Sequence, residues 1–254
     1  MPIEFLIFLT VFTPALVGGL NLIFNKNPNV RDTVTLLGAL ITFYFSANIF
    51  LGFDGQATQY KLATIMPGID ISFHIEPLGI VFSLLASGLW ILTHIYAIGY
   101  MRGAKEKNHS RFFFFFSVSI ASVMGISFSG NLFTLFLFYE ILTLITFPLV
   151  SHKGSTEALR GARVYLSILL GTSIGLQLLG ISWIYFSVGT WDFVKGGILN
   201  GFFGSLELTL LVALFAFGIG KAALFPFHRW LPAAMVAPTP VSALLHAVAV
   251  VKAG

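Results

Sequence analysis

Long apolar stretches alternate with short polar connections along the whole chain. We expect one helix in each of eight stretches, near Ile3–Phe24, Thr33–Phe53, Pro77–Tyr100, Phe112–Ser129, Leu132–Val150, Val164–Val188, Leu206–Phe225 and Val241–Gly254. A helix needs about 20 mainly apolar residues to cross the hydrocarbon core of a bilayer. The pattern therefore predicts an all-α fold, a polytopic transmembrane helical bundle of about eight helices. The eighth stretch is too short to span, so we expect it to be cut off or continued by another chain.

Two segments depart from this pattern. The longest connection, Phe53–Glu76, contains Ile69, Ile71 and Phe73, which alternate with other residues as in a strand with one buried face. This alternation predicts a short extracytoplasmic hairpin. The second segment is Phe112–Phe116, a run of five phenylalanines that we expect to face lipid.

Composition agrees with a membrane protein and excludes several other classes. Hydrophobic residues make up 57% of the 254 residues and charged residues only 9%, whereas soluble domains carry about 25% charged residues. The net charge of +4 comes without a basic stretch interleaved with aromatic residues, so nucleic acid is not an expected partner. The absence of cysteine excludes disulfides, thiolate metal ligands and iron–sulfur clusters.

The basic residues are distributed unevenly between the two sets of connections. The connections after the first, third, fifth and seventh stretches hold Lys26, Arg31, Arg102, Lys105, Lys107, Arg111, Lys153, Arg160, Arg163 and Arg229. The connections on the opposite side hold only Lys61 and Lys195. Cytoplasmic connections of membrane proteins carry an excess of Lys and Arg. We therefore expect the first set to be cytoplasmic and the N-terminus to lie outside.

Glu140 is a carboxylate inside an apolar stretch. It lies roughly ten residues into the fifth stretch, which places it near the bilayer midplane. A charge at that depth costs at least about 2.5–3.5 kcal/mol, and such residues usually mark proton or ion pathways. A protonated glutamate that bonds a neighbouring helix for structural reasons is the alternative.

Lys221 lies in Gly-Ile-Gly-Lys-Ala-Ala-Leu-Phe-Pro, and this sequence predicts a broken seventh helix. Gly218 and Gly220 allow another backbone to approach, and Pro226 removes a backbone donor. Broken helices at membrane depth occur where protein or a water-filled cavity surrounds them. We interpret Lys221 as a carrier of exchangeable charge, and a lysine that snorkels to the cytoplasmic interface is the alternative.

His246 and Lys252 lie on the last stretch, after a segment punctuated by Pro232, Pro238 and Pro240. On a regular helix the two side chains are about 240° apart, so they suit successive steps of a path better than one compact site. The chain has no metal-binding, phosphate-binding or nucleophile motif. A redox or hydrolytic centre and a bound cofactor are therefore not expected.

Several strings resemble the antiporter-like subunits shared by multisubunit monovalent cation/proton antiporters, respiratory complex I and membrane-bound hydrogenases. The resemblance covers roughly residues 75 to 254, and Pro238-Thr-Pro-Val-Ser-Ala-Leu-Leu-His246 is its most specific part. The other strings are His94–Gly103 with Arg111–Phe113, Ser129–Glu140, Gly220–Lys221 with Pro226, Trp230–Pro232 and Val251–Gly254.

The resemblance implies roles for the four polar positions. Glu140 would be the family's fifth-helix glutamate, paired electrostatically with Lys221 on the broken helix. His246 and Lys252 would pass charge toward the membrane centre. Residues 1–110 would then hold helices one to three, and residues 111–254 would form a proton-translocating half-channel of helices four to eight.

The resemblance also implies a setting. We expect translocation of protons and a monovalent cation, such as Na⁺, in the cell membrane of a prokaryote. Partners would be lipid and other membrane subunits, including a chain that supplies the family's second, inverted half. A redox-driven pumping module of a complex I-like or hydrogenase-like assembly, and a scaffold that moves no ion, are the alternatives.

Overall fold

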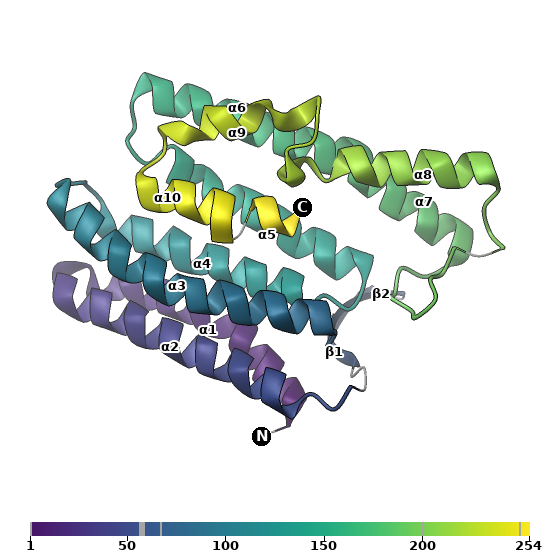
Figure 1. Cartoon of the computed structure of the whole chain (residues 1–254), viewed down its shortest axis with the longest axis horizontal. Helices are drawn as coiled ribbons and strands as arrows, with labels where there is room; N and C mark the ends of the chain where they lie inside the picture. Colours follow the sequence, from purple (N-terminus) through teal and green to yellow (C-terminus); the bar gives the residue numbers. More distant parts are fainter. Residues whose placement is uncertain (1, 56–58, 67, 200, 249) are drawn as a thin grey trace.

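The computed structural model describes residues 2–55, 59–66, 68–199, 201–248 and 250–254, and helices dominate it (Figure 1). The long helices are α1 (Ile3–Ile23), α2 (Pro28–Gly52), α3 (Pro77–Gly103), α4 (His109–Ser127), α5 (Leu132–Val150), α6 (Thr156–Thr172), α7 (Leu178–Val188) and α8 (Ser205–Gly218). A π-helical segment, Ser173–Gln177, joins α6 to α7 into one continuous rod. Six helical segments of the described chain are long and apolar enough to cross a membrane. The protein is an all-α, polytopic membrane bundle.

The C-terminal part consists of short pieces, because prolines and a helix break interrupt it. After α8 come the 3₁₀ turns Gly220–Ala222 and Phe227–Arg229, then α9 (Trp230–Ala233), a turn at Ala234–Val236, α10 (Thr239–Ala243), a π turn at Leu244–Val248 and a last 3₁₀ turn at Val251–Ala253. The broken seventh helix predicted from the sequence is therefore confirmed. The predicted eighth stretch is helical, although its described residues pass from α to π to 3₁₀ geometry.

Three predicted helix bounds need correction. The sixth predicted helix begins at Thr156 rather than Val164, because the Ser155 side chain accepts a hydrogen bond from the amide of Ala158 and caps a longer helix. Arg160 and Arg163 thus lie on α6 and not in a loop. The second helix begins at Pro28, and the seventh ends at Gly218 rather than at Phe225.

Helices α1, α2, α4 and α5 pack side by side, and α4 contacts both α1 and α5 (Figure 1). This position explains the phenylalanine run. Phe112, Phe113 and Phe116 are at most 2% exposed, so the expectation that the run faces lipid is wrong for these three. A helix with neighbours on several sides needs large apolar side chains around its circumference.

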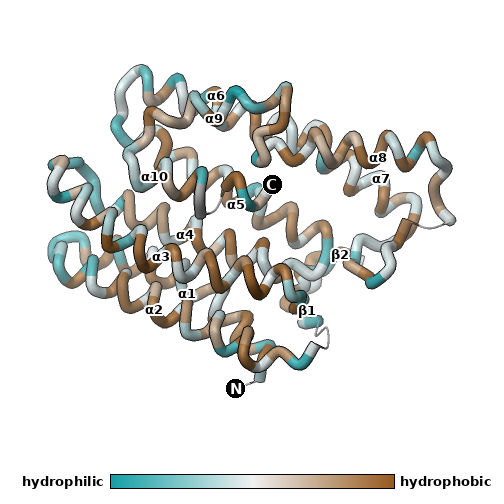
Figure 2. The backbone as a smooth tube through the Cα atoms, in the orientation of Figure 1, coloured by the Kyte–Doolittle hydropathy of each residue, from teal (hydrophilic) through white to brown (hydrophobic). Residues whose placement is uncertain are grey.

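The connections between helices lie at two opposite ends of the bundle. The links after α1, α3 and α5 lie at one end in Figure 1, and the hairpin and the link between α7 and α8 lie at the other. Polar residues mark the ends, whereas the helix bodies are largely hydrophobic (Figure 2). Most basic connections therefore share one end. That this end is cytoplasmic remains a prediction from the positive-inside rule.

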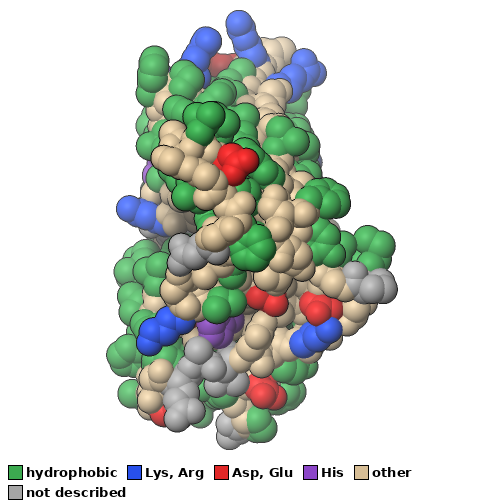
Figure 3. Space-filling model, turned by 90° about the vertical axis from the view of Figure 1, so that its right-hand side faces the viewer, with side chains coloured by type: hydrophobic (Ala, Val, Ile, Leu, Met, Phe, Trp, Pro, Cys, Tyr) green, Lys and Arg blue, Asp and Glu red, His purple; other side chains and the backbone are tan. Residues whose placement is uncertain are grey.

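The predicted hairpin is present, formed by antiparallel strands β1 (Gln59–Met66) and β2 (Ile69–His74). An ion pair between Lys61 and Asp70 joins the strands, and the Lys61 hydrogen bond lowers the pKa of the Asp70 carboxyl. The amide of Ser72 donates to Thr134 Oγ1 on α5, so the hairpin is fastened to that helix. Figure 3 looks onto this end, where charged side chains are scattered among hydrophobic ones.

A buried charged cluster ties the other ends of α2 and α3 together. Arg31 donates twice to Asp32 Oδ1, and Arg102 donates to Asp32 Oδ2. Arg31 and Asp32 are only 2% and 5% exposed, although the sequence pattern assigned Arg31 and Arg102 to connections. The buried His94 contacts the Asp32 carbonyl oxygen through Nε2 and the Phe113 ring through its edge. Two arginines thus compensate the one buried carboxylate.

Candidate functional site

The site begins where the seventh predicted helix breaks. Helix α8 ends at Gly218, Ile219 leaves the helical conformation, and Gly220–Ala222 forms one tight turn. Ala223 then takes a left-handed conformation with φ +54°, which is unfavourable for a residue with a Cβ. The break turns Lys221 into the bundle. Its side chain is completely buried, so the alternative of a lysine that snorkels to the interface is wrong.

Uncharged oxygens of α5 hold the Lys221 ammonium. Its Nζ atom donates to the carbonyl oxygen of Tyr139 at 2.7 Å and to Thr143 Oγ1 at 2.6 Å, and it lies over the Tyr139 ring. The Lys221 amide also donates to the Tyr139 hydroxyl at 3.2 Å. The turn around Lys221 is therefore fixed to one face of α5.

Glu140 is adjacent to Tyr139 but does not contact Lys221 directly. Among the described residues, no ion pair within 4.0 Å joins the two side chains, although they interact electrostatically. Glu140 lies beside the Ser173 side chain at the start of the π segment. Its Oε1 atom is buried and has no protein hydrogen-bond partner. The two predicted charges are thus close neighbours held by different partners.

Polar residues that the sequence analysis did not single out continue from this point. Thr146 and Tyr165 share a hydrogen bond of 2.6 Å between their hydroxyls. The Tyr165 ring packs edge-on against Trp230, whose indole nitrogen donates to the Gly220 carbonyl oxygen at 2.8 Å. These contacts link α5, α6, α9 and the helix break. The sequence does carry one signal for this polar face: the spacing of Tyr139, Thr143 and Thr146 places three hydroxyls on one side of a helix.

The π segment between α6 and α7 packs directly against the break. A Cβ atom at Gly218 would lie 2.6 Å from the Gln177 amide nitrogen, and one at Gly220 would collide with Thr172. Only glycine permits this approach. Gln177 is 2% exposed, and its Oε1 atom has no protein hydrogen-bond partner. Gln177 and Glu140 therefore both present an unsatisfied buried oxygen near the break, which suits water or a cation.

His246 and Lys252 lie close to this region along the chain, but neither is among the residues that bind the Lys221 ammonium. His246 lies in the π turn, and its Nε2 atom is buried without a protein partner. The turn Val251–Ala253 packs against Gly220–Ala222, but the Lys252 side chain is exposed. Since neither residue is on a regular α-helix, the predicted 240° separation does not apply. In the described part of the chain, no group of three or more potential metal ligands is present.

Comparison with known proteins decides the family. A family model described as NADH:quinone oxidoreductase/Mrp antiporter, TM, matches residues 129–254. A second, described as NADH-Ubiquinone oxidoreductase (complex I), chain 5 N-terminus, matches residues 66–113. Together they match more than half of the chain. The chain belongs to the antiporter-like membrane subunit family.

Two relatives illustrate the breadth of the antiporter-like family. The chain is 32% identical to the chloroplastic NAD(P)H-quinone oxidoreductase subunit 5 of Ipomoea purpurea over 97% of its own length and 37% of that protein. It is 33% identical to a Na⁺/H⁺ antiporter subunit of Alkalihalophilus pseudofirmus over 87% of its own length and 28% of that protein. The chain thus spans about a third of the length of these antiporter-like relatives.

A solved structure shares the fold. The archaeal membrane-bound sulfane sulfur reductase, a respiratory membrane complex, contains a chain that superposes with a TM-score of 0.83. The alignment covers 96% of this chain and 38% of the other, at 21% identity. This similarity concerns the fold of the antiporter-like bundle alone.

Proposed function

We propose that this chain translocates protons, in exchange for or alongside a monovalent cation such as Na⁺, through a half-channel centred on Glu140 and Lys221. One observation carries the proposal: a completely buried ammonium lies at a helix break and is held by uncharged oxygens of α5. Charges within membrane helices are costly and mostly mark ion paths or proton relays. Relatives named as antiporter subunits support the same activity.

The geometry suits a switch between two arrangements of Lys221. In the arrangement described above, its ammonium is bound by Tyr139 and Thr143. In the second, the ammonium would pair with the neighbouring Glu140, whose Oε1 atom is buried without a partner. A proton or cation that reaches Glu140 would weaken this pairing and return Lys221 to the oxygens of α5. The flexible lysine stem and the broken helix permit such movement without unfolding a regular element.

His246 and Lys252 would extend the path beyond the break. The turn that carries Lys252 packs against the turn that carries Lys221, and His246 has a buried ring nitrogen free of protein partners. An imidazole can accept a proton at one nitrogen and donate from the other. We therefore assign these residues to relay steps between Lys221 and the rest of the translocating unit.

We further propose that the chain acts in the cell membrane of a prokaryote as part of a multisubunit complex. Several relatives are subunits of bacterial antiporters or of quinone oxidoreductases. The alternative is a redox-driven pumping module, which would use the same relay but take its energy from another subunit. No redox group is assigned to this chain.

The test uses the full membrane complex that contains this chain, reconstituted into vesicles. We expect Glu140→Gln and Lys221→Ala to abolish ion movement driven by a pH gradient while the complex stays assembled. The reason is that each change removes one member of the switching pair and leaves the other charge uncompensated. Glu140→Asp should retain part of the flux, because the charge persists with a shorter reach.

Glu157→Gln is the matched control, since it removes one carboxylate from an exposed turn of α6. Co-purification of the other subunits monitors assembly. Normal flux through a fully assembled Glu140→Gln complex would contradict the translocating role and favour a scaffold. Flux that requires electron transfer in every preparation would favour the redox-driven module.

A further inference from the structure

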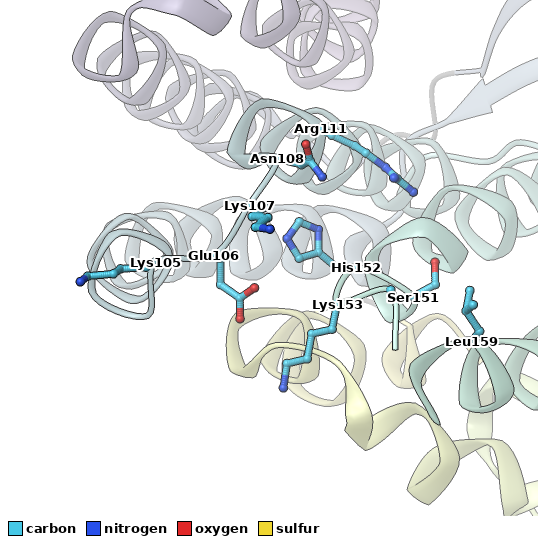
Figure 4. A pocket seen from close by; sticks show the side chains of 10 residues that line it. Lys105, Glu106, Lys107, Asn108, Arg111, Ser151, His152, Lys153 and Leu159 are labelled. Atoms are coloured by element: carbon cyan, nitrogen blue, oxygen red, sulfur yellow. The ribbon is translucent and has the colours of Figure 1, made fainter. Parts of the chain in front are cut away.

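A second polar feature lies far from the Glu140–Lys221 region, at the end of the bundle where most basic connections gather. A cavity of about 650 Å³ opens between the connection that follows α3 and the connection that follows α5 (Figure 4). We call it the basic pocket and define it by Lys105, Lys107, Arg111, Lys153, Glu106 and His152. The proposed ion path does not use any of these residues.

The charges of the basic pocket are strongly unbalanced. Four of its side chains are cationic and only Glu106 is anionic. Burial lowers the pKa of His152, which disfavours a positive charge on its ring. In Figure 4, Lys105 extends away from the other labelled side chains, which leaves Lys107, Arg111 and Lys153 as the main cations. Like charges that line one cavity repel each other, and a bound anion relieves the repulsion.

Contacts with aromatic rings form the wall of the basic pocket. The His152 ring bonds to the backbone of Lys107 and packs edge-on against Phe112, with ring centroids 5.4 Å apart. These contacts join the two connections. The Arg111 guanidinium lies 5.9 Å from the centre of the Phe115 ring, which limits its freedom. The ring contacts fix this wall, and the exposed side chains of Lys107, Arg111 and Lys153 line the same cavity.

The position of the pocket identifies the kind of anion. Helix α4 begins at His109 and α5 ends at Val150, and both are candidate membrane spans. The pocket therefore lies just beyond the hydrocarbon core, at the depth of lipid headgroups. Leu159 on α6 forms part of its lining and is 40% exposed, so an apolar group borders the charged space. Basic pockets between transmembrane helices on the cytoplasmic side suit phosphate-bearing headgroups.

We propose that the basic pocket binds the phosphate headgroup of an anionic phospholipid. Arg111 offers a planar, multidentate donor for phosphate oxygens, and Lys107 and Lys153 add point charges. The acyl chains would leave the pocket past Leu159 toward the bilayer. A bound lipid would then join the connections after α3 and α5, which flank the α4–α5 pair along the chain.

The experiment measures binding of labelled phosphatidylglycerol to the purified, delipidated complex in detergent. The test variant replaces three cations of the pocket, Lys107→Gln, Arg111→Gln and Lys153→Gln. The matched control removes three exposed cations elsewhere, Lys26→Gln, Arg160→Gln and Arg163→Gln. We expect the test variant to bind at least about tenfold more weakly, given the contribution of each basic residue near an anionic surface. The control should bind like the wild type.

A second variant keeps the proposal testable if the triple variant does not assemble. Glu106→Gln removes the one carboxylate of the pocket and should strengthen phosphatidylglycerol binding several-fold. Equal binding by the test variant and the wild type would overturn the proposal, as would equal loss in the control. Binding of zwitterionic phosphatidylcholine with the same affinity would also overturn it. If inorganic phosphate binds and phosphatidylglycerol does not, the ligand is soluble phosphate and the lipid assignment is wrong.

Discussion

Lys221 has partners that are unusual for a buried cation, because its ammonium is bound by a carbonyl oxygen and a hydroxyl rather than by a carboxylate. A salt bridge in such a site would hold the lysine in one arrangement. Neutral acceptors bind the ammonium less strongly and leave Glu140 available as a second partner. This arrangement of the residue pair supports the proposed exchange of partners.

The Thr143 hydroxyl provides the sharpest single-residue prediction. Thr143→Val removes one of the two acceptors of the Lys221 ammonium and keeps the side-chain shape. Hydrogen bonds to charged groups contribute about 1.5–3 kcal/mol, so we expect pH-gradient-driven flux to fall roughly tenfold. Thr143→Ser should restore it. Thr93→Val is the control, because the Thr93 hydroxyl donates to backbone carbonyl oxygens of its own helix. A similar loss there would contradict the specific role of Thr143.

At the scale of elements, the helix break and the π segment form one packed unit. Gly218 and Gly220 approach Gln177 and Thr172 so closely that an added methyl group would meet them. Both elements depart from regular α-helical geometry at membrane depth, which is tolerated where protein surrounds the irregular backbone. The proposed path across the break would therefore depend on backbone packing as well as on charged side chains.

Gly220→Ala tests this dependence without changing any charge. The new Cβ would overlap Thr172 and displace the turn that carries Lys221. We expect flux to fall by more than about tenfold while the complex still assembles, because small displacements at a site are costly. Gly171→Ala, one position from Thr172 on α6, has open space around its Cβ and should be neutral. Full activity of Gly220→Ala would show that close packing at the break is unnecessary.

Sequence patterns predicted the apolar helices, the hairpin and the break, because hydropathy, strand alternation and Gly/Pro spacing are local properties. Glu140 and Lys221 could be singled out for the same reason, since a charge in an apolar stretch is visible in one segment. The Tyr139 and Thr143 contacts could not, because they depend on which face of α5 meets the break. The burial of Arg31 likewise depends on a packed neighbour, because its guanidinium donates to Ser110 Oγ and lies over the Phe113 ring, both on α4. The division at residue 110 stays a prediction.

At the scale of the whole molecule, the bundle brings the connections after α1, α3 and α5 to one end and the hairpin and the α7–α8 connection to the other (Figure 1). The sequence pattern assigned nine basic residues to the first set of connections and only Lys61 and Lys195 to the second. Because Lys and Arg rarely remain on the translocated side, the asymmetry predicts one orientation. The basic pocket then faces the cytoplasm, and the hairpin faces outside.

Orientation can be measured directly, because the chain contains no cysteine. Lys107→Cys and Lys195→Cys place single thiols on exposed positions at opposite ends of the bundle. A membrane-impermeant maleimide should label position 195 in intact cells and position 107 only in inverted vesicles. Detergent-solubilised protein, in which both thiols must react, is the control for accessibility.

Labelling of both positions from the same side would reject the topology, and the reverse pattern would place the N-terminus inside. The reverse pattern would also remove the cytoplasmic assignment on which the lipid proposal for the basic pocket depends.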